Sequence, residues 1–360
     1  MWKKLQNSRS RFFTIAVFSL VAFWTFLSLF DPGPINHAPW VRWDSNHYLS
    51  ISSNGYQAVS CGAYVCGNTG WFPLYPALIF IAQIITSLPA HLVGLIISCA
   101  AFMLLVLQVC SLSKAPIGPS FLFVILSVLP GSIYLVSVFP LSLATVFVLA
   151  YISALKRNRW LLACFFGFLS VAAYPSAILC SASPLVFFLQ KRSTHRVVDF
   201  LHCVVASAAP WISYLSMQWL IESLSGFPRA YLLTQQRYGH SIGFGFETLR
   251  TSLRYFYVNP IFMQSLIVFV LLLAVLLYLV WTGAWKDPVA SSLFFYMFLI
   301  FMVYQLYGDS ISSYRQEALM APGFLFFSVR LPFFWLLLGM GLMFPLSLEM
   351  TKLFLSGVLV

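Results

Sequence analysis

The sequence predicts an all-α, polytopic membrane protein, and three observations carry this prediction. The chain has 360 residues, of which 61% are hydrophobic and 8% charged, whereas soluble domains carry about 25% charged residues. Its apolar segments are nearly continuous rather than alternating, which favours helices over a transmembrane barrel. Several of them approach the ~20 residues that a helix needs to cross a bilayer. We therefore expect a single transmembrane domain over residues 1–360.

The N-terminal segment predicts the first membrane span. Residues 1–11 carry four basic side chains, and residues 12–30 carry no charge. A cleaved signal peptide is the alternative, but the apolar run is long and no small-residue cleavage site follows it. A retained helix with its basic flank in the cytoplasm is therefore expected. It places the polar loop at residues 31–71 outside the cytoplasm, where stretches such as residues 43–54 could form helices on the membrane surface.

The rest of the chain predicts further apolar spans, which bring the total to roughly 11 at ~20 residues per crossing. Several are short and contain proline, which indicates broken helices packed within protein. The expected segments are residues 72–88, 91–112, 120–134, 140–155, 160–173, 176–189, 197–221, 260–281, 289–307, 318–329 and 333–348.

Basic clusters predict the orientation of these spans. The clusters at residues 156–159 and 191–196 indicate cytoplasmic loops. Four apolar segments lie between residues 72 and 155. An odd number of crossings is needed there, because the chain must pass from the outer first loop to the cytoplasmic cluster at residues 156–159. One segment must therefore be non-spanning, and the prolines at 130 and 140 favour a place for it within residues 120–155.

Counting the membrane crossings in chain order places three polar loops on the outer face. These are residues 31–71, 222–259 and 308–315, whereas Lys286 and Arg330 fall inside. The formal net charge of +11, from 20 Lys and Arg against 9 Asp and Glu, then reflects cytoplasmic anchors and contact with anionic membrane lipids. We expect a multi-pass protein of the cell (inner or plasma) membrane with no nucleic-acid partner. The sequence predicts no oligomeric state.

The first outer loop contains the most promising chemical group, Asp44. Asp44, His47 and Tyr48 would share one face of a helix at positions i, i+3 and i+4. An aspartate can take a proton from an acceptor hydroxyl, with a histidine tuning it or binding a ligand. The alternative is structural: Asp44 caps a surface helix and pairs with Arg42.

Two cysteines lie in the same loop, five residues apart, at Cys61 and Cys66. In an oxidising compartment they could form a local disulfide. No histidine pattern suitable for zinc lies nearby, and a lone outer aspartate disfavours a tight metal site. We therefore expect the disulfide and no metal or other cofactor.

The two later loops supply candidate anion-binding groups. Arg237 lies among amides and aromatic residues beside Gln235, and guanidinium groups bind phosphate well. Arg250 and Arg254 are more typical of an interfacial anchor. Arg315 follows Tyr314 at the mouth of an apolar segment, where it could either snorkel to the interface or hold a phosphate.

Other catalytic and transport motifs are missing from the sequence. The patterns G-x-x-x-x-G-K-[ST], H-E-x-x-H and G-x-S-x-G do not occur. Nothing indicates a nucleotide-binding domain, which disfavours a nucleotide-sugar donor and ATP-driven transport. Ionisable residues are scarce within the spans, which weakens ion-coupled transport.

Several motifs together resemble the PIG-V family, which comprises the second mannosyltransferase of glycosylphosphatidylinositol synthesis and its prokaryotic relatives. The specific block reads RWDSNHY at residues 42–48, GY at 55–56 and WFPLYP at 71–76. Weaker matches are P-x-x-Y at 228–231 and Q-x-x-Y-G at 235–239. A third, loose match covers Ser313 to Arg315 and the later Pro322, with Tyr-Arg where the family has Arg-Tyr.

The resemblance implies a GT-C fold with a helical outer first loop, and a polyprenyl-phosphate-linked sugar donor. By position, it implies that Asp44 is the catalytic base of an inverting transfer of a hexose, mannose in this family. The acceptor would be a lipid or an extracytoplasmic glycan. Two alternatives stay open: a transporter or flippase of lipid-linked sugars, and an inactive scaffold with the same fold. On the enzyme hypothesis, Arg315 and Arg237 bind the donor phosphate, and the other substrate contacts come from Arg42, His47, Tyr48, Gln235 and Tyr314.

Overall fold

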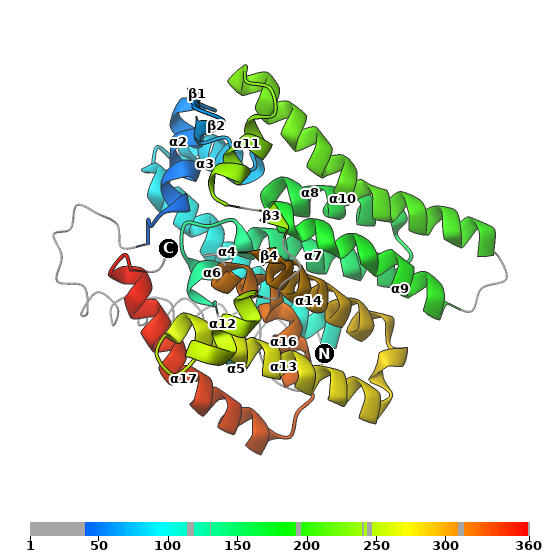
Figure 1. The fold of residues 1–360 in the computed structure, drawn as a ribbon. Helices are drawn as coiled ribbons and strands as arrows, with labels where there is room; N and C mark the ends of the chain where they lie inside the picture. The colour runs from blue at the N-terminus through cyan, green and yellow to red at the C-terminus, as the bar shows by residue number, and fades with distance from the viewer. Residues whose placement is uncertain are drawn as a thin grey trace.

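The computed structural model describes residues 40–113, 119–129, 131–191, 196–239, 241–242, 247–308 and 313–358. The predicted first span at residues 12–30 and the start of the first outer loop lie outside the described residues. The described chain is mostly helical (Figure 1). Its elements are α2 (Asp44–Asn54), β1 (Ala58–Cys61), β2 (Tyr64–Gly67), α3 (Leu74–Thr86), α4 (Ala90–Ser113), α5 (Pro119–Val128), α6 (Ile133–Val136), α7 (Leu141–Lys156), α8 (Trp160–Ala173), η1 (Pro175–Ala182), α9 (Ser183–Gln190), α10 (Arg196–Ser225), α11 (Ala230–Arg237), β3 (Ser241–Ile242), α12 (Glu247–Tyr255), α13 (Pro260–Thr282), η2 (Ala284–Lys286), α14 (Pro288–Leu306), β4 (Tyr307–Gly308), α15 (Ser313–Gln316), η3 (Glu317–Met320), α16 (Ala321–Ser328) and α17 (Phe333–Leu355).

Five of the described helices are long and apolar enough to cross a membrane: α4, α10, α13, α14 and α17. Five shorter apolar helical segments accompany them. Large apolar side chains remain exposed along the long helices, as at Trp219 (69%) and Trp281 (91%), where a soluble protein would place polar groups. The length and composition of these helices confirm the prediction of a helical, multi-pass membrane protein.

Prolines account for the shortness of several apolar segments. The predicted span at residues 176–189 divides into the 3-10 turn η1 and the helix α9, and each begins with a proline in its first turn. The span predicted at residues 318–329 likewise divides into η3 and α16, where Pro322 opens the α-helix. Proline favours the first turn of a helix because it has no N–H to donate, so it restarts the helix instead of continuing it.

One end of the helix bundle gathers the elements of the outer loops, and we call it the loop end. The N–H of Val138 donates to the carbonyl of Trp40 at 3.3 Å, which holds the start of α7 against the start of α2. Arg42 donates to the carbonyl of Leu355, so the last helix α17 also finishes here. Strand β2 packs against α11 at the same end.

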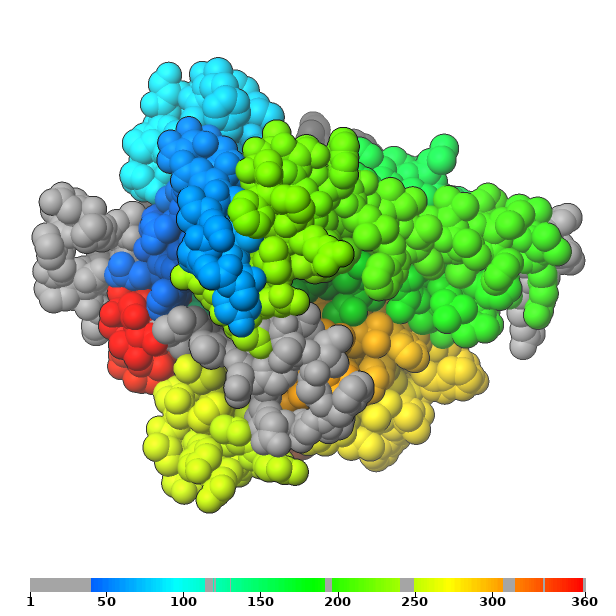
Figure 2. Space-filling model, turned by 45° about the horizontal axis from the view of Figure 1, so that its top comes forward, coloured from blue at the N-terminus to red at the C-terminus, as the bar shows by residue number. Residues whose placement is uncertain are grey.

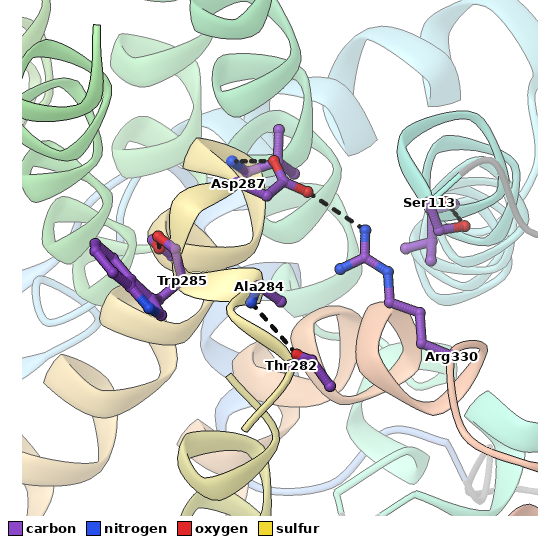
Figure 3. Close-up of polar contacts among 9 residues, drawn as sticks. Ser113, Thr282, Ala284, Trp285, Asp287 and Arg330 are labelled. Carbon is purple, nitrogen blue, oxygen red and sulfur yellow. Dashed lines mark hydrogen bonds and ion pairs between the residues drawn. The ribbon is translucent and has the colours of Figure 1, made fainter. Parts of the chain in front are cut away.

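The opposite end carries the basic residues, and we call it the basic end. Lys191 donates to Asn158 Oδ1 at 3.3 Å, which joins the end of α9 to the turn between α7 and α8. Gln190 donates to the carbonyl of Trp285 at 2.8 Å, which adds the turn between α13 and α14. Figure 3 shows Arg330 reaching from the end of α16 to Asp287 in this turn, with 3.4 Å between Nη2 and Oδ2. The groups predicted to be cytoplasmic therefore meet at one end of the bundle.

The segment from α5 to Pro140 lies along part of α4. Phe123 packs edge-to-face on Phe102 in the middle of α4. Further along, Ser98, closer to the start of α4, donates to the carbonyl of Phe139 at 2.9 Å. The segment is thus antiparallel to α4 and returns to the loop end. The place of the non-spanning segment within residues 120–155 stays a prediction.

Helix α3 packs at the loop end. It packs against α2 and α4, and Figure 1 shows it beside α2. The hydroxyl of Tyr75, in its first turn, donates to the carbonyl of Gly94 at 2.8 Å. Gly94 is in the second turn of α4, so α3 and the start of α4 cover only a short part of the bundle. Hydropathy alone could not show this packing, because α3 is as apolar as the longer helices.

Candidate active site

An ion pair between Asp44 and Arg315 lies at the centre of the loop end. Arg315 Nη1 donates to Asp44 Oδ2 across 271 positions of sequence. The side chain of Asp44 is 22% exposed and that of Arg315 is 11% exposed. Two loops predicted to share the outer face therefore supply opposite charges to one partly buried point, where water screens the pair less than at the surface.

Local structure explains the position of Asp44. Trp43 precedes α2 with a positive φ of 44°, which turns the chain sharply before the helix begins. Its ring packs edge-to-face on Phe354, 5.3 Å between ring centroids. Asp44 then occupies the first turn of α2, where free backbone N–H groups favour a negative charge. The structural alternative of a pair with Arg42 is not observed, since Arg42 donates to the carbonyl of Leu355 instead.

His47 faces the same region and stacks on an indole ring. Its imidazole lies 3.6 Å from Trp71 between ring centroids, at an interplanar angle of 14°. Trp71 in turn contacts Tyr238 edge-to-face at 5.9 Å, and Arg237 lies over the Tyr238 ring at 5.8 Å. Burial lowers the pKa of His47, the charge of Asp44 opposes this shift, and Arg237 adds to it. His47 is therefore a neutral imidazole near pH 7, which can both donate and accept a hydrogen bond.

The lowered pKa of His47 predicts a pH-dependent stability. The unfolded chain binds the His47 proton more readily than the folded chain does, so stability falls as pH drops below about 6.5. We expect the thermal unfolding midpoint of the purified protein to fall less steeply below pH 6.5 in His47→Gln than in the wild type. The two proteins should show parallel profiles above that pH. Equal slopes below pH 6.5 would show that His47 does not titrate in this way.

Tyr48 is buried rather than open to a ligand. Only 1% of it is exposed, and its ring packs edge-to-face on Tyr75 at 5.5 Å and on Phe139 at 6.4 Å. Its predicted contact with substrate therefore requires a different arrangement from the one described. In this structure Tyr48 fixes α2 on the bundle and so supports the orientation of Asp44.

The first and second outer loops pack directly on each other. Figure 2 shows the blue first-loop segment alongside the yellow-green segment that contains α11. The hydroxyls of Thr69 and Thr234 are 2.7 Å apart, and Gln235 Nε2 donates to the carbonyl of Gly70 at 2.9 Å. Gln235, predicted to contact substrate, thus has a structural contact that places Arg237 and Tyr238 beside His47.

Gly70 allows this close approach, which gives a second testable prediction. A Cβ atom at Gly70 would lie 2.9 Å from Thr234 Cγ2 and 3.1 Å from Gln235 Nε2. Gly70→Ala should therefore push α11 away and cost about 1–3 kcal/mol of stability, as overpacking does. Gly341→Ala is the matched control, because nothing lies within 4 Å of its added Cβ. Equal unfolding midpoints for the two variants would contradict the described contact.

The β1–β2 hairpin carries the two loop cysteines. Its strands pair antiparallel, with Cys61 opposite Tyr64 and Val59 opposite Cys66. The structure joins Cys61 and Cys66 in a disulfide, with 5.7 Å between their Cα atoms. The bond closes the hairpin next to α11, since Thr234 also lies 3.4 Å from the carbonyl of Val65.

Sequence reasoning missed part of the polar environment near Arg315. Gln316 donates to the hydroxyl of Tyr174, which follows α8. Glu317, 5% exposed, accepts hydrogen bonds from Gln264 and from Ser265, the latter at 2.7 Å. Tyr174, Gln316 and Glu317 fall just outside the predicted apolar segments, whereas Gln264 and Ser265 lie within the one at residues 260–281. The available signal was Gln264, because a polar group within a membrane span is costly unless it is satisfied.

One predicted group cannot be placed in the site. The side chain of Tyr314 lies outside the described residues. Within the described ranges, no group of three or more His, Cys, Asp or Glu side chains could hold a metal ion. The predicted residues that the structure does bring together are Asp44, His47, Arg237 and Arg315.

Fold and site together define a helical, multi-pass membrane protein with a charged, aromatic-lined polar site at one end of its bundle. Comparisons of the chain with protein-family models, with curated proteins and with solved structures found no match.

Proposed function

We propose that the protein is a membrane glycosyltransferase of the PIG-V type, with a GT-C fold of roughly 11 spans. It would transfer a hexose, most plausibly mannose by family resemblance, from a polyprenyl-phosphate donor to a lipid or glycan acceptor. The observation that carries the proposal is the meeting of Asp44 and Arg315, a base and a phosphate-binding group, at the end where the predicted outer loops gather. The loop end would face the extracytoplasmic side, and the basic end the cytoplasm.

Asp44 is the general base in this proposal. Its carboxylate accepts the proton of the acceptor hydroxyl while the acceptor oxygen attacks the anomeric carbon. The bond between this carbon and the phosphate oxygen breaks on the opposite face, and polyprenyl phosphate leaves with the electron pair. One displacement with one base inverts the anomeric configuration. The partial exposure of Asp44, 22%, leaves room for an acceptor to approach it.

Arg315 stabilises the leaving phosphate in this proposal. A guanidinium has five N–H donors and can bond carboxylate and phosphate oxygens along different edges. Donor binding would therefore draw Arg315 toward the phosphate and leave Asp44 freer to accept a proton. Arg237 adds positive charge near His47, whose pKa it lowers while Asp44 raises it.

Aromatic side chains would bind the sugar itself. Tyr238 is 43% exposed and packs on Trp71 beside His47, and such an aromatic surface can cover the apolar face of a sugar ring. A neutral His47 can exchange hydrogen bonds with sugar hydroxyls. The site would thus combine a base, an anion-binding group and a sugar platform, which is a sufficient set for this reaction.

The test is a transfer assay with purified protein in liposomes. The donor is a synthetic, radiolabelled polyprenyl-phosphate mannose, supplied with a lipid extract as acceptor. The proposal predicts label in a new glycolipid or glycan, with release of polyprenyl phosphate. Movement of intact donor across the bilayer without transfer would instead support a flippase. If the assay shows no transfer and no movement of the donor, a non-catalytic scaffold would be favoured.

A further inference from the structure

A polar cavity lies at the basic end, far from the proposed active site. It is an open pocket between α4, α7 and α8 with a volume of about 260 Å³, far above the ~10–15 Å³ that a single water needs. It is separated from the loop end by the length of α7, whose 16 residues span roughly 24 Å at 1.5 Å per residue. Its polar lining consists of Gln108, Ser111, Ser153, Arg157 and Arg159.

The turn between α7 and α8 holds the two arginines at this cavity. Asn158 adopts a left-handed backbone with φ 54°, and its side chain accepts a hydrogen bond from Lys191 at 3.3 Å. Lys191 is fixed in turn by an ion pair with Asp199 at 2.8 Å. The N–H of Arg159 donates to the carbonyl of Ala154 at 2.9 Å. The contacts through Lys191 thus connect the turn to α10. Arg157 and Arg159 both line the cavity.

The half-buried Gln108 offers the cavity a hydrogen-bond acceptor. Gln108 Oε1 is shielded from solvent and has no hydrogen-bond partner among the described residues. A buried polar atom without a partner costs about 1–3 kcal/mol, so a ligand that supplies a donor would be stabilised here. Hydroxyls of Ser111 and Ser153 can donate to oxygens of the same ligand.

The rest of the lining is apolar and continues onto the outer surface of α8. Leu162 and Phe166 line the cavity, and the neighbouring Leu161 and Phe165 are 86% and 55% exposed. In a membrane protein such a surface contacts acyl chains. The cavity therefore offers guanidinium groups and hydroxyls at one side and an acyl-compatible surface at the other.

We propose that the α4–α7–α8 cavity is a binding site for an anionic phospholipid. Arg157 and Arg159 would hold its phosphate, Gln108 would accept a hydrogen bond from a headgroup hydroxyl, and Leu162 and Phe166 would contact its acyl chain. A phosphatidylglycerol-type headgroup supplies both the negative phosphate and the hydroxyl donors. This inference is independent of the proposed transfer reaction.

The test measures binding of fluorescent phosphatidylglycerol to the purified full-length protein in a neutral detergent. The wild type should prefer it over phosphatidylcholine, and Arg157→Gln/Arg159→Gln should weaken binding by about 10- to 30-fold, from ~1 kcal/mol for each basic residue near an anionic headgroup. Arg250→Gln/Arg254→Gln is the matched control. It removes the same charge from α12 and should keep wild-type binding.

A second variant separates the cavity from simple charge attraction. Ser153→Leu fills the cavity without changing the charge and should also weaken binding, while its unfolding midpoint shows that the protein has folded. Equal losses of lipid binding in the two double-arginine variants, or no loss of binding in Ser153→Leu, would overturn the site. Displacement of the lipid by millimolar inorganic phosphate would identify a soluble anion as the ligand and would likewise overturn the proposal.

Discussion

Asp44→Asn is expected to abolish nearly all sugar transfer, because the amide cannot accept the proton of the acceptor hydroxyl. Loss of a general base typically lowers the rate by about 10²–10⁴-fold. The effect should fall on kcat, while donor affinity changes less, since Arg315 and Arg237 would still bind the phosphate. Turnover of labelled polyprenyl-phosphate mannose in liposomes measures both quantities.

Glu349→Gln is the control for this substitution. It also converts an acid to its amide, but Glu349 is a surface residue of α17 that pairs with Lys352 within one helix turn, and its side chain is 47% exposed. This variant should keep wild-type transfer. Full activity in Asp44→Asn would contradict the role of Asp44, whatever the effect of Glu349→Gln.

Arg315→Gln is expected to impair both transfer and stability. Removal of one preorganised donor to a developing negative charge typically costs about 10²–10³-fold in rate. The same change leaves the partly buried Asp44 without its ion-pair partner, which costs about 1–3 kcal/mol. Donor KM should rise as well, because Arg315 would bind the phosphate in the ground state too.

A double-mutant cycle separates these two effects. If the pair interacts as described, Asp44→Asn/Arg315→Gln should be more stable than the sum of the single losses predicts, by about 0.5–3 kcal/mol. Arg330→Gln is the matched control, because it breaks an arginine–aspartate pair at the basic end. It should leave transfer intact. Additive losses in the cycle would indicate that Asp44 and Arg315 do not interact in the folded protein.

The helices were predictable because each apolar run is bounded by prolines or charges. The predicted segment at residues 160–173 matches α8, and residues 260–281 match α13 within one residue. The packing of α3 was not predictable in the same way. Helix α3 exposes apolar side chains such as Ile84 and Ile85, so its composition resembles that of the longer apolar helices.

The site was predictable in its charges but not in its packing. Asp44, Arg237 and Arg315 stood out because acids and bases outside the cytoplasmic anchors are few in this chain. Their convergence depends on pairings across more than a hundred residues, such as Gln235 with Gly70, which no local pattern specifies. The burial of Tyr48 and the bond from Gln316 to Tyr174 depend on the same tertiary packing.

The configuration of the newly formed glycosidic bond tests the central claim most directly. Wild-type protein is supplied with a β-linked polyprenyl-phosphate mannose, and the anomeric configuration of the product is determined by NMR. A single displacement with Asp44 as base predicts an α-linked mannoside. A β-linked product, or no transfer from this donor to any lipid or glycan acceptor, would contradict the account.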